Sequence, residues 1–304
     1  MAEGDIPRAL DERVVALRPP VPRPDGSAVA RAFLDEELAR SGRVEEVATI
    51  ILVNRECPFR CVYCDLWKET TPWVLPAGAV PAQLDAALTS LPAARHLKLY
   101  NAGSFFDPLA IQPADHEPIA DRSAPFETLI VESHPVYVGP KVLAFRRRLR
   151  PRLEVAIGLE TAHPDVLPRL NKRMTVADFE RAARFLTGEG IFVRAFVLVD
   201  PPHLPPRERI DWAVRSAETA FAAGSDTVVL IPVRGGNGIL EEMHAAGEFL
   251  PARLETVVEA AERVLALRGG RVFVDLWDIE RFATGTPAFS TLRSRLERLN
   301  QTQS

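Results

Sequence analysis

The sequence predicts an α/β protein built around a parallel β-sheet. Short apolar runs rich in β-branched residues recur along the chain, and amphipathic helical patterns separate them. The first run, residues 47–53, is continuously apolar, as expected for a strand that is covered on both faces. The chain has 304 residues, of which 47% are hydrophobic, and this length suffices for one large core. We therefore expect a single domain.

Strands and helices alternate along this predicted core, which we place at residues 44–285. We expect about seven strands, at residues 47–53, 96–100, 128–132, 153–159, 191–199, 227–231 and 271–275. Helices are expected between them, at residues 81–91, 143–150, 176–189, 207–223 and 254–267. Right-handed crossovers bring such units into a parallel sheet that either curls into a full or partial barrel or stays open. The spacing of the elements is compatible with both arrangements.

The two ends of the chain are expected to lie outside the core. Prolines cluster between positions 19 and 24, so we expect residues 1–27 to be an extended lead-in along the surface. Residues 28–40 carry apolar side chains at helical spacing, which predicts a short amphipathic helix. Together these segments make an N-terminal extension, residues 1–43. Residues 286–304 are expected to form a C-terminal tail.

Charge and hydropathy argue against two classes of protein. The net charge is −4, so the chain has no overall basic field that would drive non-specific nucleic-acid binding. No apolar run reaches the roughly 18 residues that a membrane span requires, and the acidic N-terminus lacks the apolar segment of a secretory signal. We therefore expect a cytoplasmic protein that has no membrane partner.

All three cysteines lie in one short stretch, at Cys57, Cys61 and Cys64. An odd number in so tight a loop argues for a metal site rather than a set of disulfides. Structural zinc usually takes four ligands from paired motifs, which makes it the weaker interpretation here. A [4Fe-4S] cluster held by three thiolates keeps one iron open for an external ligand. The cysteine count allows one such cluster and no second one.

The C-x3-C-x2-C spacing, with Tyr63 just before the last cysteine, resembles the radical SAM superfamily. This resemblance implies that S-adenosylmethionine (SAM) binds the open iron and that an electron from the cluster cleaves it to a 5′-deoxyadenosyl radical, which abstracts hydrogen from a substrate. It also implies an external one-electron donor such as flavodoxin or ferredoxin. The superfamily's partial (β/α)6 TIM-like barrel, with the cluster loop after its first strand, decides between the two sheet arrangements.

Polar residues follow several of the predicted strands, where a barrel of this kind carries its active site. The segments that contain them resemble the subgroup of the elongator catalytic subunit, the methylthiotransferases and NifB. Asn101 and Ala102 depart from the glycines that this subgroup usually has. The resemblance implies SAM contacts from Tyr63, Gly103, Ser104, Glu132, Glu160, Lys172 and Arg173.

Over residues 40–285 the chain most resembles small radical SAM proteins related to the lyase of archaeosine synthesis. This implies a nucleobase-like small molecule or RNA as substrate. The polar residues that remain suit a planar heterocycle with polar edges. They are Asp107, His134, Arg234, Asn237, Trp277 and Asp278. Asp107, His134 and Asp278 are the candidates for a catalytic role.

Two alternatives stay open. Residues 146–152 contain five arginines, which form either a phosphate-contacting face for RNA or an ordinary solvated helix. The chain is either a radical SAM enzyme, acting on RNA or on a free small molecule, or a protein that binds a cluster and SAM for assembly or regulation without turnover. Reductive cleavage of SAM separates these two classes of function.

Overall fold

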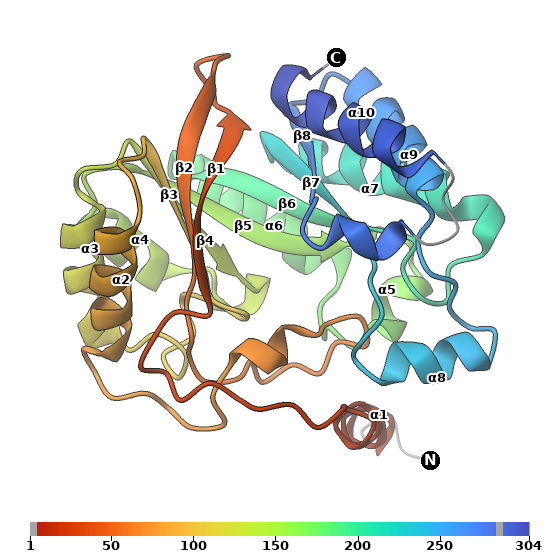
Figure 1. Cartoon of the computed structure of the whole chain (residues 1–304), viewed down its shortest axis with the longest axis horizontal. Coiled ribbons are helices and arrows are strands. Elements are labelled where there is room, and N and C mark those ends of the chain that lie inside the picture. Colours follow the sequence, from red (N-terminus) through yellow and green to blue (C-terminus); the bar gives the residue numbers. More distant parts are fainter. Residues whose placement is uncertain (1–4, 284–287, 304) are drawn as a thin grey trace.

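Eight strands form one sheet in which each strand lies beside its neighbour in sequence, from β1 to β8 (Figure 1). The structure is a computed structural model and describes residues 5–283 and 288–303. Strands β2 to β8 are parallel, and β1 is antiparallel to β2. The strands are β1 (Arg31–Leu38), β2 (Val44–Ile51), β3 (His96–Tyr100), β4 (Thr128–Ser133), β5 (Arg152–Glu160), β6 (Phe192–Val199), β7 (Thr227–Pro232) and β8 (Arg271–Val274).

Helices follow most of the strands and cover the outer face of the curled sheet (Figure 1). The α-helices are α1 (Asp5–Ala16), α2 (Ala79–Ser90), α3 (His116–Ser123), α4 (Pro140–Arg146), α5 (Val166–Arg169), α6 (Val176–Gly188), α7 (Arg209–Ala222), α8 (Ile239–Ala245), α9 (Leu254–Ala266) and α10 (Phe289–Thr302). Short 3-10 helices are η1 (Leu66–Glu69), η2 (Pro113–Asp115), η3 (Pro135–Tyr137), η4 (Pro206–Glu208) and η5 (Ile279–Phe282).

The sheet curls without closing. Among the described strands, β1 pairs only with β2 and β8 pairs only with β7. The two edges still approach each other, because the Arg271 guanidinium on β8 donates to the backbone oxygen of Leu38 on β1 at 3.0 Å. Helix α10, which lies in the predicted C-terminal tail, packs against both edge strands. The predicted partial α/β barrel is confirmed, and an antiparallel edge strand is added to its seven parallel strands.

Strand β3 shows how alternation separates the two faces of the sheet. Leu97 and Leu99 are fully buried in the main apolar cluster under the helices. Lys98 and Tyr100 point to the opposite face, as the period of two in a strand requires. Lys98 forms an ion pair with Glu37 of β1. The inside of the barrel is therefore polar, whereas its outside is apolar.

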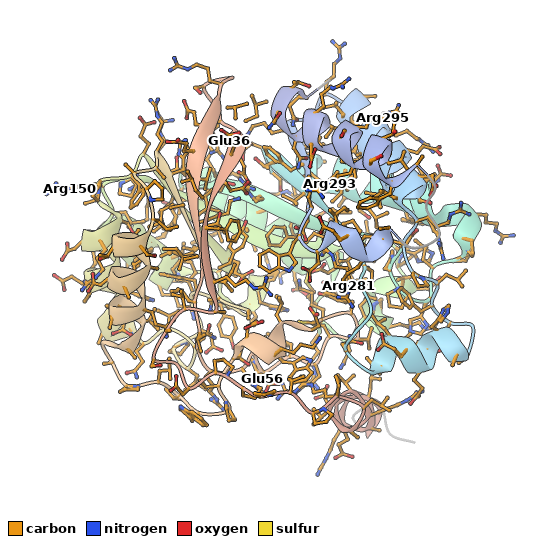
Figure 2. The ribbon with its side chains drawn as sticks, viewed as in Figure 1. Glu36, Glu56, Arg150, Arg281, Arg293 and Arg295 are labelled. Carbon is orange, nitrogen blue, oxygen red and sulfur yellow. The ribbon has the colours of Figure 1, made fainter. Side chains whose placement is uncertain are left out.

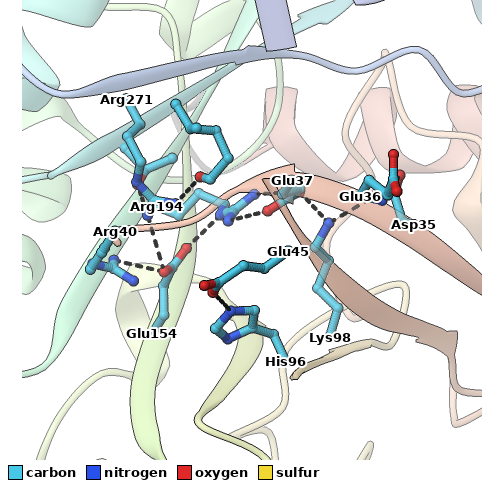
Figure 3. Close-up of polar contacts among 12 residues, drawn as sticks. Asp35, Glu36, Glu37, Arg40, Glu45, His96, Lys98, Glu154, Arg194 and Arg271 are labelled. Atoms are coloured by element: carbon cyan, nitrogen blue, oxygen red, sulfur yellow. Dashed lines mark hydrogen bonds and ion pairs between the residues drawn. The ribbon is translucent and has the colours of Figure 1, made fainter. Parts of the chain in front are cut away.

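A buried network of charges fills the base of the barrel, near the N-terminal ends of the parallel strands (Figure 3). Arg194 lies between two carboxylates: its Nε is 2.5 Å from Glu154 Oε1 and its Nη2 is 2.9 Å from Glu37 Oε2. Arg40 adds a contact of 2.7 Å to Glu154 Oε2. Burial favours a raised pKa for Glu154, but the neighbouring arginines outweigh it and hold the pKa below the ordinary value.

Two predictions for the N-terminal extension are wrong. Residues 28–40 contain strand β1 instead of a helix, because pairing with β2 along its whole length supplies backbone hydrogen bonds that helical spacing cannot outweigh. Residues 1–27 are not extended throughout, because they contain α1. Its Leu10 and Val14 pack with Val62 of the cysteine loop. In Figure 1, α1 lies at the lower edge, beyond the C-terminal ends of the parallel strands.

The structure also bears on the prediction about membranes. Within residues 5–283 and 288–303, no helix combines the length and the apolar composition that crossing a membrane requires.

Candidate active site

The cysteine loop begins where β2 ends and lies at the C-terminal mouth of the barrel (Figure 1). Cys57, Cys61 and Cys64 are free thiols that line one small pocket. The other residues around this pocket are Arg18, Glu56, Phe59, Arg60, Trp67 and Ala102. The structure thus brings the three predicted ligands together, at the position that the α/β barrel architecture gives to an active site.

Distant segments hold the backbone of the loop in place. The Asn171 side chain donates to the Arg60 oxygen at 2.8 Å, and the Asn237 side chain donates to the Val62 oxygen at 2.8 Å. The Phe59 ring stacks on His134, with the ring centroids 4.0 Å apart. Three elements that follow different strands therefore fix the conformation of the loop.

The donor set fits a cluster. Burial raises the pKa of each of the three thiols to about 12. The thiols therefore keep their protons near neutral pH unless a bound metal replaces them. In the described residues, no group of three or more Cys, His, Asp or Glu side chains is arranged to hold one metal ion. Three thiols around one pocket match the number that holds a [4Fe-4S] cluster with one iron open, whereas structural zinc usually takes four protein ligands.

The turn after β3 lies against the cysteine loop and surrounds Glu132. A Cβ built on Gly103 would lie 3.5 Å from the Cβ of Cys57, so the two loops are in contact. The backbone N–H of Asn101 donates to Glu132 Oε1 at 2.6 Å, and those of Ala102 and Gly103 also bond this carboxylate. Burial outweighs these bonds and raises the pKa of Glu132 to about 7.

A buried ion pair lies on the other side of the cysteines. Lys172 Nζ pairs with Glu160, which ends β5 in a left-handed conformation with φ 66°. A Cβ at Gly158 would overlap both charged groups, so any larger residue would have to displace the ends of both side chains. The Tyr63 side chain is hydrogen-bonded to both Glu160 and Cys61, and thereby links the pair to the cysteine loop. Lys172 thus places a cation beside the thiols.

Two buried polar groups beside the cysteines have no partner within the described part of the chain. Both side-chain polar atoms of Asn101 are unpaired, although this residue is fully buried. The Nε of Arg18 is buried and unpaired as well. Because buried polar groups normally form hydrogen bonds, these atoms mark places where a ligand would supply them.

Solved structures that superpose on this chain include three enzymes that are distant from it in sequence. A radical SAM methyltransferase from Sphaerobacter thermophilus superposes with a TM-score of 0.50 at 15% identity, over 80% of this chain and 76% of that one. The radical SAM fold is therefore the fold of this chain. Methylornithine synthase has a TM-score of 0.53 at 12% identity, over 81% and 69% of the two chains. Methanocaldococcus infernus Elp3 has a TM-score of 0.50 at 17% identity, over 73% and 59%. The predicted resemblance to radical SAM enzymes is confirmed.

Curated proteins give matches that are closer in sequence but shorter. No protein-family model matches the chain. The archaeosine synthase subunit beta of Thermococcus kodakarensis is 31% identical over 170 residues, and that of Methanosarcina acetivorans is 28% identical over 178 residues. These matches cover 54% and 56% of this chain, and they span about half of each relative, 52% and 51%. An uncharacterized protein of Methanocaldococcus jannaschii is 20% identical over 76% of this chain and 68% of its own length.

Several residues predicted to contact ligands in this radical SAM fold also hold its loops. The Ser104 hydroxyl accepts from the His134 N–H at 2.9 Å, and His134 Nε2 lies 3.0 Å from the Lys172 oxygen. Asp107 accepts from the Tyr137 hydroxyl at 3.1 Å. Arg173 pairs with an aspartate of α1 and is engaged away from Lys172.

Several of the polar residues predicted to face a substrate have partners within the protein. Arg234 donates to Asp275 at 2.9 Å, and Asn237 is committed to the cysteine loop. The Trp277 ring lies under the Arg31 guanidinium, 4.2 Å from the ring centroid. Asp278 is exposed. The catalytic roles suggested for Asp107, His134 and Asp278 remain predictions.

Arg18, from the segment after α1, is the residue that the sequence analysis missed. It donates to Glu56 Oε1 at 2.8 Å, and its guanidinium lies 4.6 Å from the centroid of the Trp67 ring. Glu56 also forms ion pairs with Arg23 and Arg60. It is labelled in the lower part of Figure 2. The available signal was the apolar spacing of Leu10 and Val14 in α1 and of Leu17 directly after it, because this spacing predicts a helix that leads to Arg18.

Proposed function

We propose that this chain is a radical SAM enzyme that cleaves SAM reductively and abstracts hydrogen from a nucleobase-like substrate, in the modification of a nucleoside or of tRNA. Cys57, Cys61 and Cys64 would hold one [4Fe-4S] cluster. The observation that carries this proposal is the set of three half-buried thiols around one pocket at the mouth of a radical SAM fold. When bound, such a cluster supplies a single electron to the sulfonium of SAM.

The protein's own groups would orient SAM beside the thiols. Lys172 is a buried cation that suits the carboxylate of the methionine moiety. The Asn101 amide offers a donor and an acceptor that no described residue uses. Glu132 and Glu160 add carboxylates at neighbouring strand ends, where an amino group or ribose hydroxyls would find acceptors. Burial of these groups strengthens each such contact.

A nucleoside substrate is supported by the relatives and by the lining of the barrel. Two relatives are named archaeosine synthase subunit beta. Tyr100 and Phe196 meet edge to face, with ring centroids 5.9 Å apart, on strands whose alternation directs them into the barrel. Flat aromatic surfaces favour a planar heterocycle. The electron would come from an external donor such as flavodoxin or ferredoxin, and cytoplasmic conditions suit reduced cysteines.

Reductive cleavage of SAM is the test. The chain is reconstituted with iron and sulfide without oxygen, reduced with dithionite and incubated with SAM. Formation of methionine and 5′-deoxyadenosine is expected. Binding of SAM without either product would instead support the assembly or regulatory alternative. Deuterium transfer into 5′-deoxyadenosine from labelled tRNA or from labelled free nucleosides would then distinguish RNA from a small molecule.

A further inference from the structure

A second hollow opens on the outside of the barrel, between α3 and α4. Its volume is about 300 Å³, and none of its lining residues belongs to the cysteine loop. Its apolar walls come from α4 and from the segment before α3. They are Phe106, Pro108, Ile111, Pro113, Ala114, Ala144 and Phe145. This volume is at the lower end of the range for ligand pockets and has room for one small planar group.

The hollow has a polar floor. His116 lies among aromatic rings, stacked on Phe105 with the ring centroids 5.5 Å apart. One ring nitrogen bonds the backbone of Phe105, whereas Nε2 is buried and has no partner in the described residues. Burial, with Arg148 and Lys141 nearby, lowers the pKa of His116 and keeps the ring neutral. A neutral imidazole can donate to or accept from the polar edge of a heterocycle.

Two cations and one acid stand at the rim. Lys141 and Arg148 are exposed, and neither has a carboxylate partner in residues 5–283 and 288–303. Lys141 Nζ lies 4.7 Å from the centroid of the Tyr137 ring, and Arg148 donates to a backbone oxygen of its own helix. Glu117 lines the α3 side of the hollow. The α4 side is thus positive and available to an anion.

This positive rim continues into the arginine segment after α4. None of the arginines within residues 146–152 forms an ion pair in the described part of the chain. On the opposite side of the molecule, Arg293 and Arg295 pair with Glu280 and Glu262. Figure 2 shows Arg150 projecting from one side, and Arg293 and Arg295 on the other. On the α4 side, the described arginines lack ion-pair partners and Lys141 has only an electrostatic interaction with Asp107, which favours a phosphate-bearing ligand.

We propose that the hollow between α3 and α4 binds one nucleotide unit, with the base against the apolar walls and the phosphate between Lys141 and Arg148. The base would meet His116 Nε2 with its polar edge. The aromatic walls favour a planar body over an alkyl chain, and the unpaired cations favour a phosphate. The nucleotide comes either from an RNA strand, which rests on the proposed function, or from a free nucleotide, which does not.

Binding to the full-length chain tests this with two probes. A labelled single-stranded oligoribonucleotide is followed by fluorescence anisotropy, and AMP by calorimetry. The Lys141→Gln/Arg148→Gln variant should bind RNA about tenfold more weakly and lower the salt slope by about one, because one phosphate contact is lost. Ala144→Phe should fill the hollow and weaken binding without changing that slope. Arg293→Gln/Arg295→Gln, which removes paired arginines elsewhere, should bind as the unmodified chain does.

Each outcome decides the proposal. If RNA or AMP binds and both hollow variants weaken it, the site is confirmed and the probe that binds identifies the source. The proposal is overturned if neither probe binds, or if both hollow variants bind as the unmodified chain does. Iron content and SAM cleavage are measured in the same variants and should not change. If neither probe binds the hollow, the proposed radical SAM function is unaffected. If the unmodified chain does not cleave SAM, the proposal that the hollow binds a nucleotide is unaffected.

Discussion

The two ends of the barrel interior treat buried polar groups differently. At the base, Glu37, Arg194 and Glu154 lie in direct contact with opposite charges (Figure 3). At the mouth, the Asn101 amide and the Arg18 Nε are buried, and neither has a partner in the described residues. Both ends are desolvated, so the difference lies in whether the protein itself supplies the partner.

This difference separates stability from function. A buried charge that keeps all its partners specifies packing, and it is costly only when one partner is removed. A buried polar group without a partner costs free energy in the folded chain and is compensated when a ligand binds. Substitutions at the base should therefore change the free energy of unfolding, and substitutions at the mouth should change what the protein binds.

The largest expected effect is at the mouth. Cys57→Ala, Cys61→Ala and Cys64→Ala should each abolish cluster binding and SAM cleavage, because each removes one of three thiol ligands. The reconstituted unmodified chain should contain about four irons, as one [4Fe-4S] cluster requires. Iron and sulfide analysis measures both. About eight irons in the unmodified chain, or a retained cluster in any single variant, would show that the ligand assignment is incomplete.

The base should respond in stability. Arg194→Met leaves two buried carboxylates without their main partner and should lower the free energy of unfolding by about 3–5 kcal/mol. Urea unfolding of the iron-free chain measures this. The matched control is Arg293→Met, which breaks two surface pairs, with Glu280 and Glu297, and should cost about 1 kcal/mol or less. Equal effects in the two variants would remove the distinction between the base network and surface pairs.

The same network predicts how acid affects stability. The folded pKa of Glu154 lies below its ordinary value, so its contribution is present above that value and is lost as the pH falls below it. The unmodified chain should therefore lose stability more steeply in acid than Glu154→Gln does. Parallel urea titrations from neutral pH into acid check this. A steeper loss in the variant would contradict the sign of the shift.

Lys172→Met should weaken SAM binding by roughly tenfold or more, since a charge-assisted contact is worth at least about 1.5 kcal/mol. The cluster should remain, because no thiol is lost. Calorimetry with SAM measures the affinity, and iron analysis is the control. Lys172→Arg keeps the charge and should recover part of the binding. Unchanged affinity in Lys172→Met would move the carboxylate contact to another cation.

The smallest expected effect comes from Arg18. A cation near the thiols favours the more negative, reduced state of a cluster, so Arg18→Gln should shift the reduction potential to a more negative value. A redox titration followed by electron paramagnetic resonance measures this. Arg8→Gln, on the exposed surface of α1, is the matched control and should leave the potential unchanged. The same potential in all three proteins would place Arg18 outside the electrostatic environment of the cluster.

Local sequence signals were sufficient for the core of the fold. Continuous apolar runs predicted the parallel strands, and β3 was predicted with the boundaries it has in the structure, His96–Tyr100. The segment Arg31–Leu38 was misassigned because its acids look solvent-exposed at helical spacing. In the structure, Glu37 points into the barrel toward Lys98 and Arg194. Only tertiary contacts with residues far along the chain reveal that arrangement.

The candidate site divides in the same way. The three cysteines lie within eight residues of one another, so their spacing alone indicates a cluster. Asn171 and Asn237 hold the backbone of the cysteine loop because the barrel brings their loops beside it. No local sequence pattern predicts these contacts. Arg18 lies two residues after the end of α1, but the prolines that follow it, between positions 19 and 24, led to the prediction that residues 1–27 are extended.

The hydrogen bonds that hold the cysteine loop also determine when, during synthesis, the loop can take its folded shape. Asn171 bonds Arg60 across 111 residues, and Asn237 bonds Val62 across 175 residues. Chains are synthesised from the N-terminus at about 5–20 residues per second, so the cysteines leave the ribosome well before either asparagine exists. Until then the loop has its thiols without the shape that positions them. Under the proposed function, loading of a cluster into the folded loop would therefore follow synthesis of β7 and the loop after it.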